Sequence, residues 1–411
     1  MRIHWLVALA TGITALPHAA SADTISLAEA LARAEARPDV AVAAADLDGA
    51  RGERTQARLP FYNPELALAV GPRMAAGTVG VGFEASLGQV VELGGKRTAR
   101  RAVAAAREDL AQVRLASSTR QARLDAWAAF HLALVGAARV DSARALETLA
   151  VEVAAATATR QGLGGGTQLE VNLAAAEVGR ARHDRVDAET RVDHDRAALA
   201  PAIGARGDEA PEPSGPLPAF AAPAASLDAL IAHARAERPE LQAAAATVAA
   251  ARADVDLADA VARPDLRLGV SYALERDVET AHVALVSAAI TLPTRNRNQG
   301  ARAAARARLR GATIESAWAG DEVEREVRVA YAAYVRAIAA VHGFDQDVNE
   351  HLTENLQLAR DSLASGKLDY FQFNQVRREL FASRMAYLDA VAEAIAAQVA
   401  LARATGAEVL P

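Results

Sequence analysis

His183, Asp187 and His194 are the residues whose types could hold a metal ion, because imidazole and carboxylate groups are common ligands of divalent cations. On a helix, His183 and Asp187 would share a face, but His194 lies about two turns beyond Asp187. One ion cannot bridge that spacing without a further ligand. The spacing favours a solvated polar face, and we expect neither a metal site nor a cofactor.

The sequence Gly94-Gly95-Lys96-Arg97 could suggest a phosphate-binding loop. That motif also needs a glycine five residues before Gly95 and a hydroxyl residue after the lysine, but Val90 and Arg97 stand there. The sequence also shows no local signature of a serine, histidine and acid arrangement. We therefore expect that the protein is not an enzyme.

The same glycines open the segment around which the chain is organised. No proline occurs between Lys96 and the glycine cluster at Gly162–Thr167, and a return run then continues to Gly204. Glycine inside a helix costs about 1 kcal/mol relative to alanine, so the cluster is predicted to be the turn of a helical hairpin. At about 1.5 Å per residue, the outgoing helix would be on the order of 100 Å long.

The composition agrees with long helices and narrows the partners. Of the residues, 52% are hydrophobic but only 4% are aromatic, which favours extended alanine-rich helices over a conventional core. The net charge is −6 and the arginines are scattered among acids, so nucleic acid is not an expected partner. The sequence has no cysteine, which excludes disulfides and a lipid anchor on an N-terminal cysteine.

The first residues read as a secretory signal peptide. An apolar run from Trp5 to Leu16 is followed by Ala20-Ser21-Ala22, which predicts cleavage after Ala22 and a signal peptide at 1–22. No later segment approaches the about 20 apolar residues that a membrane helix requires. Any part of the mature chain that enters a membrane is therefore expected to be a β-barrel.

The chain repeats itself at a spacing of about 200 residues, and each half is predicted to follow the order helix, two strands, long helix, turn, helix. A shared offset across five landmarks is unlike chance similarity. The landmark pairs are Ser26-Leu27 with Ser226-Leu227, Arg37-Pro38 with Arg238-Pro239, Asn63-Pro64 with Arg263-Pro264, Gly164 with Gly366, and Gly204 with Gly406.

We expect a first repeat at 23–204 and a second at 226–411, joined by a proline-rich linker at 205–225. In the first repeat, a helix at 26–59 precedes strands at about 64–91, joined by a turn at Gly71-Pro72, and a helical hairpin at 96–204. In the second, strands at about 264–292, joined through Glu275-Arg276-Asp277, precede a hairpin at 298–406. Strands of about 10 residues are long enough to cross a bilayer when tilted.

Four strands in one chain cannot close a barrel, because open edges in lipid leave backbone groups unpaired at a cost of several kcal/mol each. Several chains must therefore share one barrel. Three chains would give twelve strands, an even number within the range known for outer-membrane barrels.

The two strand-to-helix junctions, 89–97 and 292–300, resemble those of the TolC-like outer membrane factor family, and in particular the CzcC-like components of heavy-metal efflux systems. The resemblance covers essentially the whole mature chain. It implies a mainly α fold with a transmembrane β-barrel portion, in which a homotrimer forms a 12-stranded barrel in the outer membrane of a Gram-negative bacterium. The barrel continues into a periplasmic α-helical tunnel.

The resemblance also implies a function and partners. The trimer would be a passive duct of a tripartite RND-type efflux system, in contact with outer membrane lipid, a periplasmic adaptor (membrane fusion protein) and an inner-membrane pump, and would export heavy-metal cations. Drug efflux or type I secretion through the same duct is an alternative. A periplasmic coiled-coil adaptor without a pore is another, but it would carry one hairpin flanked by β-rich modules.

The resemblance carries site residues over to the turns of the two hairpins. The adaptor-facing tips would be Leu163, Gly164, Thr167, Gly366, Lys367 and Leu368. The periplasmic gate would be formed by Glu170, Gln372 and Gln375. The second tip departs from the family pattern, because it has amides where a pore-lining carboxylate pair is common, and an amide ring is neutral and less selective for cations. Leucines stand where some members have basic and aromatic locking residues.

Overall fold

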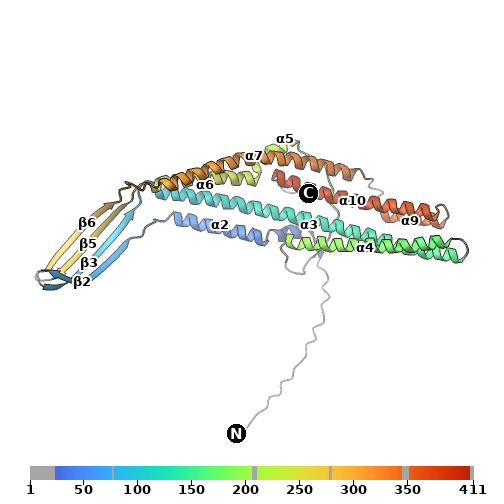
Figure 1. Cartoon of the computed structure of the whole chain (residues 1–411), viewed down its shortest axis with the longest axis horizontal. Coiled ribbons are helices and arrows are strands. Elements are labelled where there is room, and N and C mark those ends of the chain that lie inside the picture. The colour runs from blue at the N-terminus through green and yellow to red at the C-terminus, as the bar shows by residue number, and fades with distance from the viewer. Residues whose placement is uncertain (1–23, 76–77, 206–210, 277–279, 345–350, 408–411) are drawn as a thin grey trace, which may run out of the picture.

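The computed structural model describes residues 24–75, 78–205, 211–276, 280–344 and 351–407. They form a long, gently curved rod with a β-sheet at one end and helices along the remainder (Figure 1). The predicted signal peptide at 1–22 lies outside the described residues.

The sheet contains four antiparallel strands in the order β2-β3-β5-β6. Strands of the two repeats meet at its centre, where Val91 of β3 pairs with Leu266 of β5. The outer strands β2 and β6 have no partner on their far sides within the described chain. The strands are β2 (Glu65–Ala75), β3 (Thr78–Val91), β5 (Leu266–Arg276) and β6 (Thr280–Ile290).

The predicted turn at Gly71-Pro72 is wrong. Gly71 pairs with Gly82 and Pro72 pairs with Val81, so β2 continues to Ala75 and the connection to β3 comes later. Proline cannot donate to a strand ladder and is therefore restricted to places where its missing N–H is not needed, such as an edge strand. Because β2 is an edge strand, Pro72 fits inside it, and its presence in the sequence was a misleading turn signal.

The second predicted turn is also misplaced. Glu275 pairs with Ala281 and Arg276 with Thr280, so both lie in the β5–β6 ladder, and only 277–279 remain between the strands. These three residues lie outside the described part of the chain.

In the first repeat, the helix expected at 26–59 is divided into two helices. Pro38 has no N–H and disfavours helical backbone at the residue before it, and Arg37 has extended angles of φ −60° and ψ 150°. The predicted outgoing helix is confirmed as one continuous helix of 67 residues. The helices are α1 (Leu27–Ala34), α2 (Pro38–Ala57), α3 (Lys96–Gly162) and α4 (Gln168–Ala202).

In the second repeat, the outgoing segment is not continuous, contrary to the sequence-based expectation. One helix ends at His342, with Gly343 as its C-cap, and the next helix within the described residues begins at Leu352. Gly343 has right-handed angles, with φ −71°, and it favours the helix end because glycine inside a helix costs about 1 kcal/mol relative to alanine. The helices of this half are α5 (Leu227–Glu237), α6 (Pro239–Val261), α7 (Gln299–His342), α9 (Leu352–Ala364) and α10 (Tyr370–Thr405).

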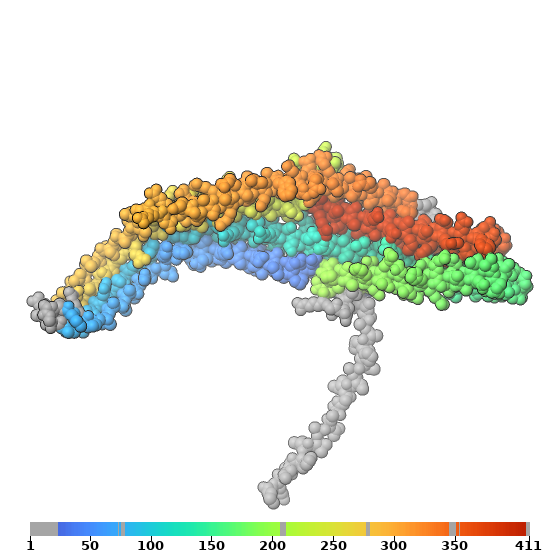
Figure 2. All heavy atoms as spheres, viewed as in Figure 1, coloured from blue at the N-terminus to red at the C-terminus, as the bar shows by residue number. Residues whose placement is uncertain are grey.

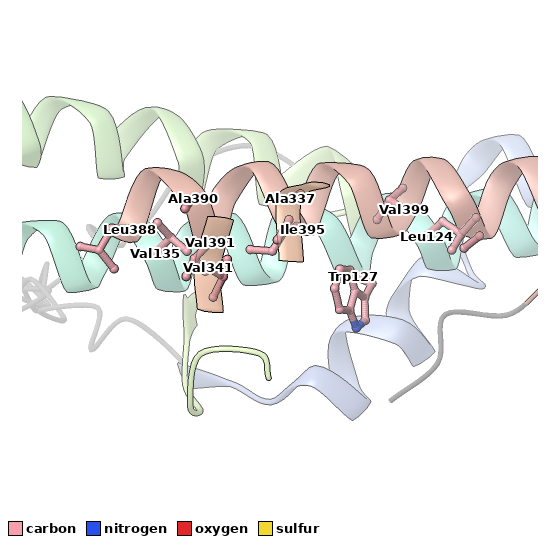
Figure 3. Packing of buried hydrophobic residues seen from close by; sticks show 12 residues of the cluster. Leu124, Trp127, Val135, Ala337, Val341, Leu388, Ala390, Val391, Ile395 and Val399 are labelled. Carbon is pink, nitrogen blue, oxygen red and sulfur yellow. The ribbon is translucent and has the colours of Figure 1, made fainter. Parts of the chain in front are cut away.

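The largest buried cluster lies in the middle of the rod, where helices of both repeats meet (Figure 3). Trp127 and Val135 of α3 pack with Leu388 and Ile395 of α10, and both α10 residues are completely buried. Large side chains at the centre therefore join the two hairpins, whereas many of the other buried positions are alanine.

The proline-rich linker is anchored to the rod. Its short strand β4 (Glu212–Pro213) lies parallel to β1 (Thr24–Ile25), and the hydroxyl of Tyr334 donates to the carbonyl of Ala221. Residues 206–210 of the linker lie outside the described part of the chain.

The expectation that no later segment is long and apolar enough to span a membrane as a helix is wrong for α10. By length and composition alone, α10 is apolar enough to do so, but 44% of its most apolar window is buried inside the chain. Since α10 supplies Leu388, Val391 and Ile395 to the central cluster, it has the environment of a core helix.

Candidate site at the hairpin tips

The two predicted tips lie side by side at the end of the rod opposite the sheet (Figures 1 and 2). The first is the turn between α3 and α4, and the second is the turn between α9 and α10. The structure thus brings together two turns that are about 200 residues apart in the sequence.

Gly164 ends α3 in a left-handed conformation, with φ +79°. Its N–H donates to the carbonyl of Gln161 at 3.0 Å, and the N–H of Gly165 donates to the carbonyl of Arg160 at 2.9 Å. These two bonds are the pair of a Schellman motif, which satisfies the last carbonyls of a helix. The conformation requires glycine, since a Cβ disfavours it even though the space around Gly164 is open.

The second tip ends in the same way. Gly366 has φ +73°, its N–H donates to the carbonyl of Leu363 at 3.1 Å, and the N–H of Lys367 donates to the carbonyl of Ser362 at 2.9 Å. Both predicted tip glycines therefore end their helices through the same Schellman motif. This role does not depend on a bound partner.

The tips present apolar side chains to solvent. Leu163 is 84% exposed, and Leu169 and Phe371 are exposed by more than half. Lys367 is exposed beside them, and Leu368 is half-buried at the edge of a shallow pocket of about 290 Å³. Exposed apolar side chains in such a group are typical of surfaces that contact another protein. The other residues that line the pocket are Asn355, Leu358, Ala359, Ser362, Val376 and Leu380.

Thr167 and Glu170 form a capping box at the start of α4. The hydroxyl of Thr167 accepts from the N–H of Glu170 at 3.2 Å, and the Glu170 carboxylate accepts from the N–H of Thr167 at 3.0 Å. The same carboxylate forms an ion pair with Arg160 at 3.2 Å, and its side chain is only 15% exposed. Glu170 thus stabilises the tip, a role that the spacing of Thr167 and Glu170 indicates but that the sequence interpretation did not use.

Gln372 has the equivalent place at the second tip. The carboxylate of Asp369 accepts from the N–H of Gln372 at 2.8 Å, and the side-chain oxygen of Gln372 accepts from the N–H of Asp369 at 3.0 Å. Gln372 and Gln375 are both exposed, one helical turn apart. Their role in a gate stays a prediction.

The sequence interpretation missed an ion pair that joins the two hairpins near their tips. Arg377 of α10 contacts Glu177 of α4, and Glu177 also pairs with Arg180 at 3.0 Å. Tyr370 lies nearby with 3% exposure, and its burial raises its pKa, to which the charge of Glu177 adds. No local sequence signal identifies such a pair, because its members belong to different repeats.

The polar residues considered as metal ligands do not come together with others. The described residues contain no group of three or more histidine, cysteine, aspartate or glutamate side chains that could hold a metal ion. The carboxylate of Asp187 instead accepts from Arg191 at 3.0 Å, and His183 and His194 are exposed.

Comparison with known proteins connects this arrangement to a family. Residues 230–407 match the family model described as outer membrane efflux protein. The cobalt-zinc-cadmium resistance protein CzcC of Cupriavidus metallidurans is 28% identical over 386 residues, which cover 90% of this chain and 86% of that protein. The second repeat therefore matches the outer membrane efflux protein family, and the similarity to CzcC extends over most of the chain.

Solved structures share the fold of this efflux protein. The outer membrane protein VceC of Vibrio cholerae has a TM-score of 0.73 at 18% identity, covering 93% of this chain and 97% of that one. CusC, described in terms of folding and transmembrane channel formation, has a TM-score of 0.70 at 18% identity, covering 93% and 92%. The predicted fold class, a helical tunnel with a barrel portion, is confirmed.

These similarities also support a coarse function. The efflux protein is an outer membrane efflux channel that extends into the periplasm and is a transport protein without enzymatic activity. Members of the family work with an adaptor and an inner-membrane pump. The alternative of a periplasmic adaptor without a pore does not fit this family or its fold.

Proposed function

We propose that this efflux protein is the outer-membrane duct of a tripartite system that exports heavy-metal cations. The observation that carries the proposal is the similarity to a cobalt-zinc-cadmium resistance protein over 90% of the chain. The duct is passive, and the choice of cargo lies largely in the pump that feeds it.

The duct is a homotrimer. Every residue of β6 is exposed, and on β2 the side chains of Leu66, Leu68 and Val70 are exposed by about two thirds or more. Strand edges in lipid must be paired, and three copies of a four-stranded sheet close a barrel of twelve strands. We expect a heat- and detergent-resistant trimer in outer-membrane fractions, held there without a lipid on cysteine. Recovery as a soluble periplasmic monomer would refute the trimer.

The tips meet the adaptor. Leu163, Gly164 and Thr167 of the first tip and Gly366, Lys367 and Leu368 of the second provide the contact surface, which the exposure of Leu163 and Lys367 supports. Glu170, Gln372 and Gln375 lie just behind that surface, where the gate is proposed.

The cargo can be tested by deleting the gene in its own host and measuring tolerance to zinc, cobalt and cadmium, together with the metal content of the cells. We expect lower tolerance, higher metal content and unchanged sensitivity to organic drugs. Restoration by the intact gene, but not by one lacking the two hairpin turns, serves as the control. Loss of drug resistance or of protein secretion with unchanged metal tolerance would favour the alternative duct functions.

A further inference from the structure

The two repeats of the chain correspond residue by residue within the strand ladders of the sheet. Pro64 before β2 corresponds to Pro264 before β5, an offset of 200. Lys96 begins α3 and Gln299 begins α7, an offset of 203, and their N-caps Gly95 and Asn298 are both left-handed. The strands keep these offsets, because Leu66 pairs with Leu87 and Leu266 with Ile290.

Because of this correspondence, the pairing of β3 with β5 within one chain predicts how the outer strands of two chains pair. Within the chain, β3 pairs with β5, so that Ser86 lies opposite Ser271 and Leu87 opposite Val270. The counterpart of β3 is β6, and the counterpart of β5 is β2. Moving the same pairing by the two offsets places Ala289 opposite Gly71, and Ile290 opposite Val70, of a second copy. Pro72 of that copy would lie opposite Ala288 and would donate no hydrogen bond to this ladder.

The side chains agree with this register. Residues directly opposite each other share a face, and the even-numbered residues of β2 and β5 are mostly apolar, including Val70 and Met74. On β6, Val286 and Ile290 lie on the face that continues theirs, and both are exposed. A slip of one residue would place Val286 and Ile290 opposite the other face of β2, which carries small residues such as Ala69 and Gly71.

The corner where strand meets helix provides a second argument. Within the chain, the long side chain of Arg263 lies against Gly94, where a Cβ would come within 2.4 Å of its Cδ. At the corresponding corner between copies, Arg297 is the counterpart of Gly94, and Asn63 is the counterpart of Arg263. Each corner therefore contains one arginine, which belongs to the second repeat in both cases, and within the chain Arg297 donates from Nε to the carbonyl of Pro293 at 3.1 Å.

Charge provides a third argument. Within the chain, the Asp265 carboxylate accepts from the N–H of Leu93 at 3.1 Å and from Lys96 at 2.7 Å. Its counterpart is Glu65, and the counterpart of Leu93 is Asn296, which stands between Arg295 and Arg297. Both arginines are exposed, as is Glu65. Among the described residues, none of these three charges has an ion-pair partner.

We propose that a second copy of this chain pairs its β2 with β6 in this register and places its Glu65 carboxylate between Arg295 and Arg297. The inference rests on the proposed trimer and specifies how its copies recognise one another.

The register can be tested by disulfide cross-linking of the full chain in outer membranes, since the protein has no cysteine of its own. Directly opposite residues are about 4.5–5.5 Å apart at Cα, within the range for a disulfide, whereas diagonal neighbours are about 7–8 Å apart. The test protein carries Ala289→Cys with Gly71→Cys, where a Cβ meets no atom within 4 Å. The shifted control carries Ala289→Cys with Ala69→Cys, and Ser86→Cys with Ser271→Cys is the reference within one chain.

We expect the test pair to give a covalent trimer on non-reducing gels, the shifted pair to give mostly monomer, and the reference pair to stay monomeric. A covalent trimer from the shifted pair alone, or a stable non-covalent trimer in which the test pair never reacts, overturns the register but leaves the proposed duct intact. Monomers throughout, without any trimer, overturn both.

The ion pair is tested separately by charge reversal. We expect Glu65→Arg to lower the temperature at which the trimer dissociates in detergent by several degrees, and the combination with Arg295→Glu and Arg297→Glu to recover most of the loss. An unchanged dissociation temperature in Glu65→Arg, or no recovery in the combined variant, overturns the charge pairing.

Discussion

Arg377 of α10 and Glu177 of α4 form an ion pair between two hairpins that are 200 positions apart in the chain. Arg377 is only 3% exposed and the side chain of Glu177 is 15% exposed. Around them, Leu149, Ala174 and Phe373 belong to one buried cluster that draws on both hairpins. The ion pair and this cluster fix the two tips relative to each other within one chain.

Removing one charge of this pair should loosen the tip end of the rod. Breaking a buried ion pair on one side costs about 3–5 kcal/mol, because the remaining charge is left uncompensated. We expect Glu177→Gln to speed amide hydrogen exchange in 168–180 and 370–380, and the double change Glu177→Leu with Arg377→Met to restore most of the protection.

Glu189→Gln is the matched control, since Glu189 pairs with Arg185 on the same helix at a more exposed place. Its exchange should stay near that of the wild type. Equal exchange rates in Glu177→Gln and the wild type would show that the buried pair does not hold the tips.

Gly164→Val and Gly366→Val should impair export while the trimer still assembles. Both glycines have positive φ, which costs a β-branched residue about 1–3 kcal/mol, and both lie at the end of the rod far from the sheet. Export is measured as metal tolerance of the host at equal protein level. Gly179→Ala, inside α4 with open space around it, should behave as the wild type. Normal export by both valine variants would place the coupling elsewhere.

Gln372→Asp tests the proposed gate. In a trimer the change adds three carboxylates, so we expect higher cation selectivity in planar bilayers and a conductance sensitive to millimolar divalent ions. The effect should weaken at high ionic strength because salt screens the added charges. The variant places an acidic residue in the first turn of α10, where the wild type has none, and a negative charge there suits the helix N-terminus. Unchanged selectivity in a correctly assembled pore would show that Gln372 does not face the lumen.

Because His131 of α3 is buried, we expect the folded protein to lose stability in mild acid. Its ring is 6% exposed and its Nδ1 lies 2.9 Å from the carbonyl of Trp127, and burial lowers the pKa of His131 below 6.5. Between the lowered folded pKa and the unfolded one, the unfolded chain binds the proton more readily, so the folded state loses stability as the pH falls through this range.

The check is the unfolding temperature at pH 7.5 and 5.5 for the wild type and for His131→Gln, which removes the titrating ring. The decrease on acidification should be smaller in His131→Gln, while His183→Gln, at an exposed site, should keep the decrease of the wild type. An equal decrease in all three proteins would assign the acid sensitivity to other groups.

The features predicted correctly from the sequence are those dictated by local backbone chemistry. The cluster at Gly162–Thr167 cannot continue a helix, and it forms the predicted turn. Local chemistry also explains the errors. Gly71-Pro72 carries the residue types of a turn, but its place at the edge of the sheet makes a strand acceptable, and only the pairing with β3 reveals that place.

In the candidate site, too, the features set by local backbone chemistry could be predicted, whereas those set by the packing of distant segments could not. The left-handed glycines at both tips follow from the sequence, because no other residue tolerates that conformation as well. The family resemblance assigns Gln372 to the gate, and the structure adds a helix-capping role, which competes with a purely lumenal one. The contact of Glu177 with Arg377 depends on how two distant hairpins pack, and single-sequence patterns carry no information about that.

The continuous α3 differs from α7 and α9, because α7 ends at His342 and α9 begins at Leu352. Each chain nevertheless holds its two tips together through the ion pair of Glu177 with Arg377 and the cluster that contains Leu149 and Phe373. In the proposed trimer, the two tips of one chain would therefore move as one unit. Widening at the tip end would occur between neighbouring chains, as three units separate with three-fold symmetry.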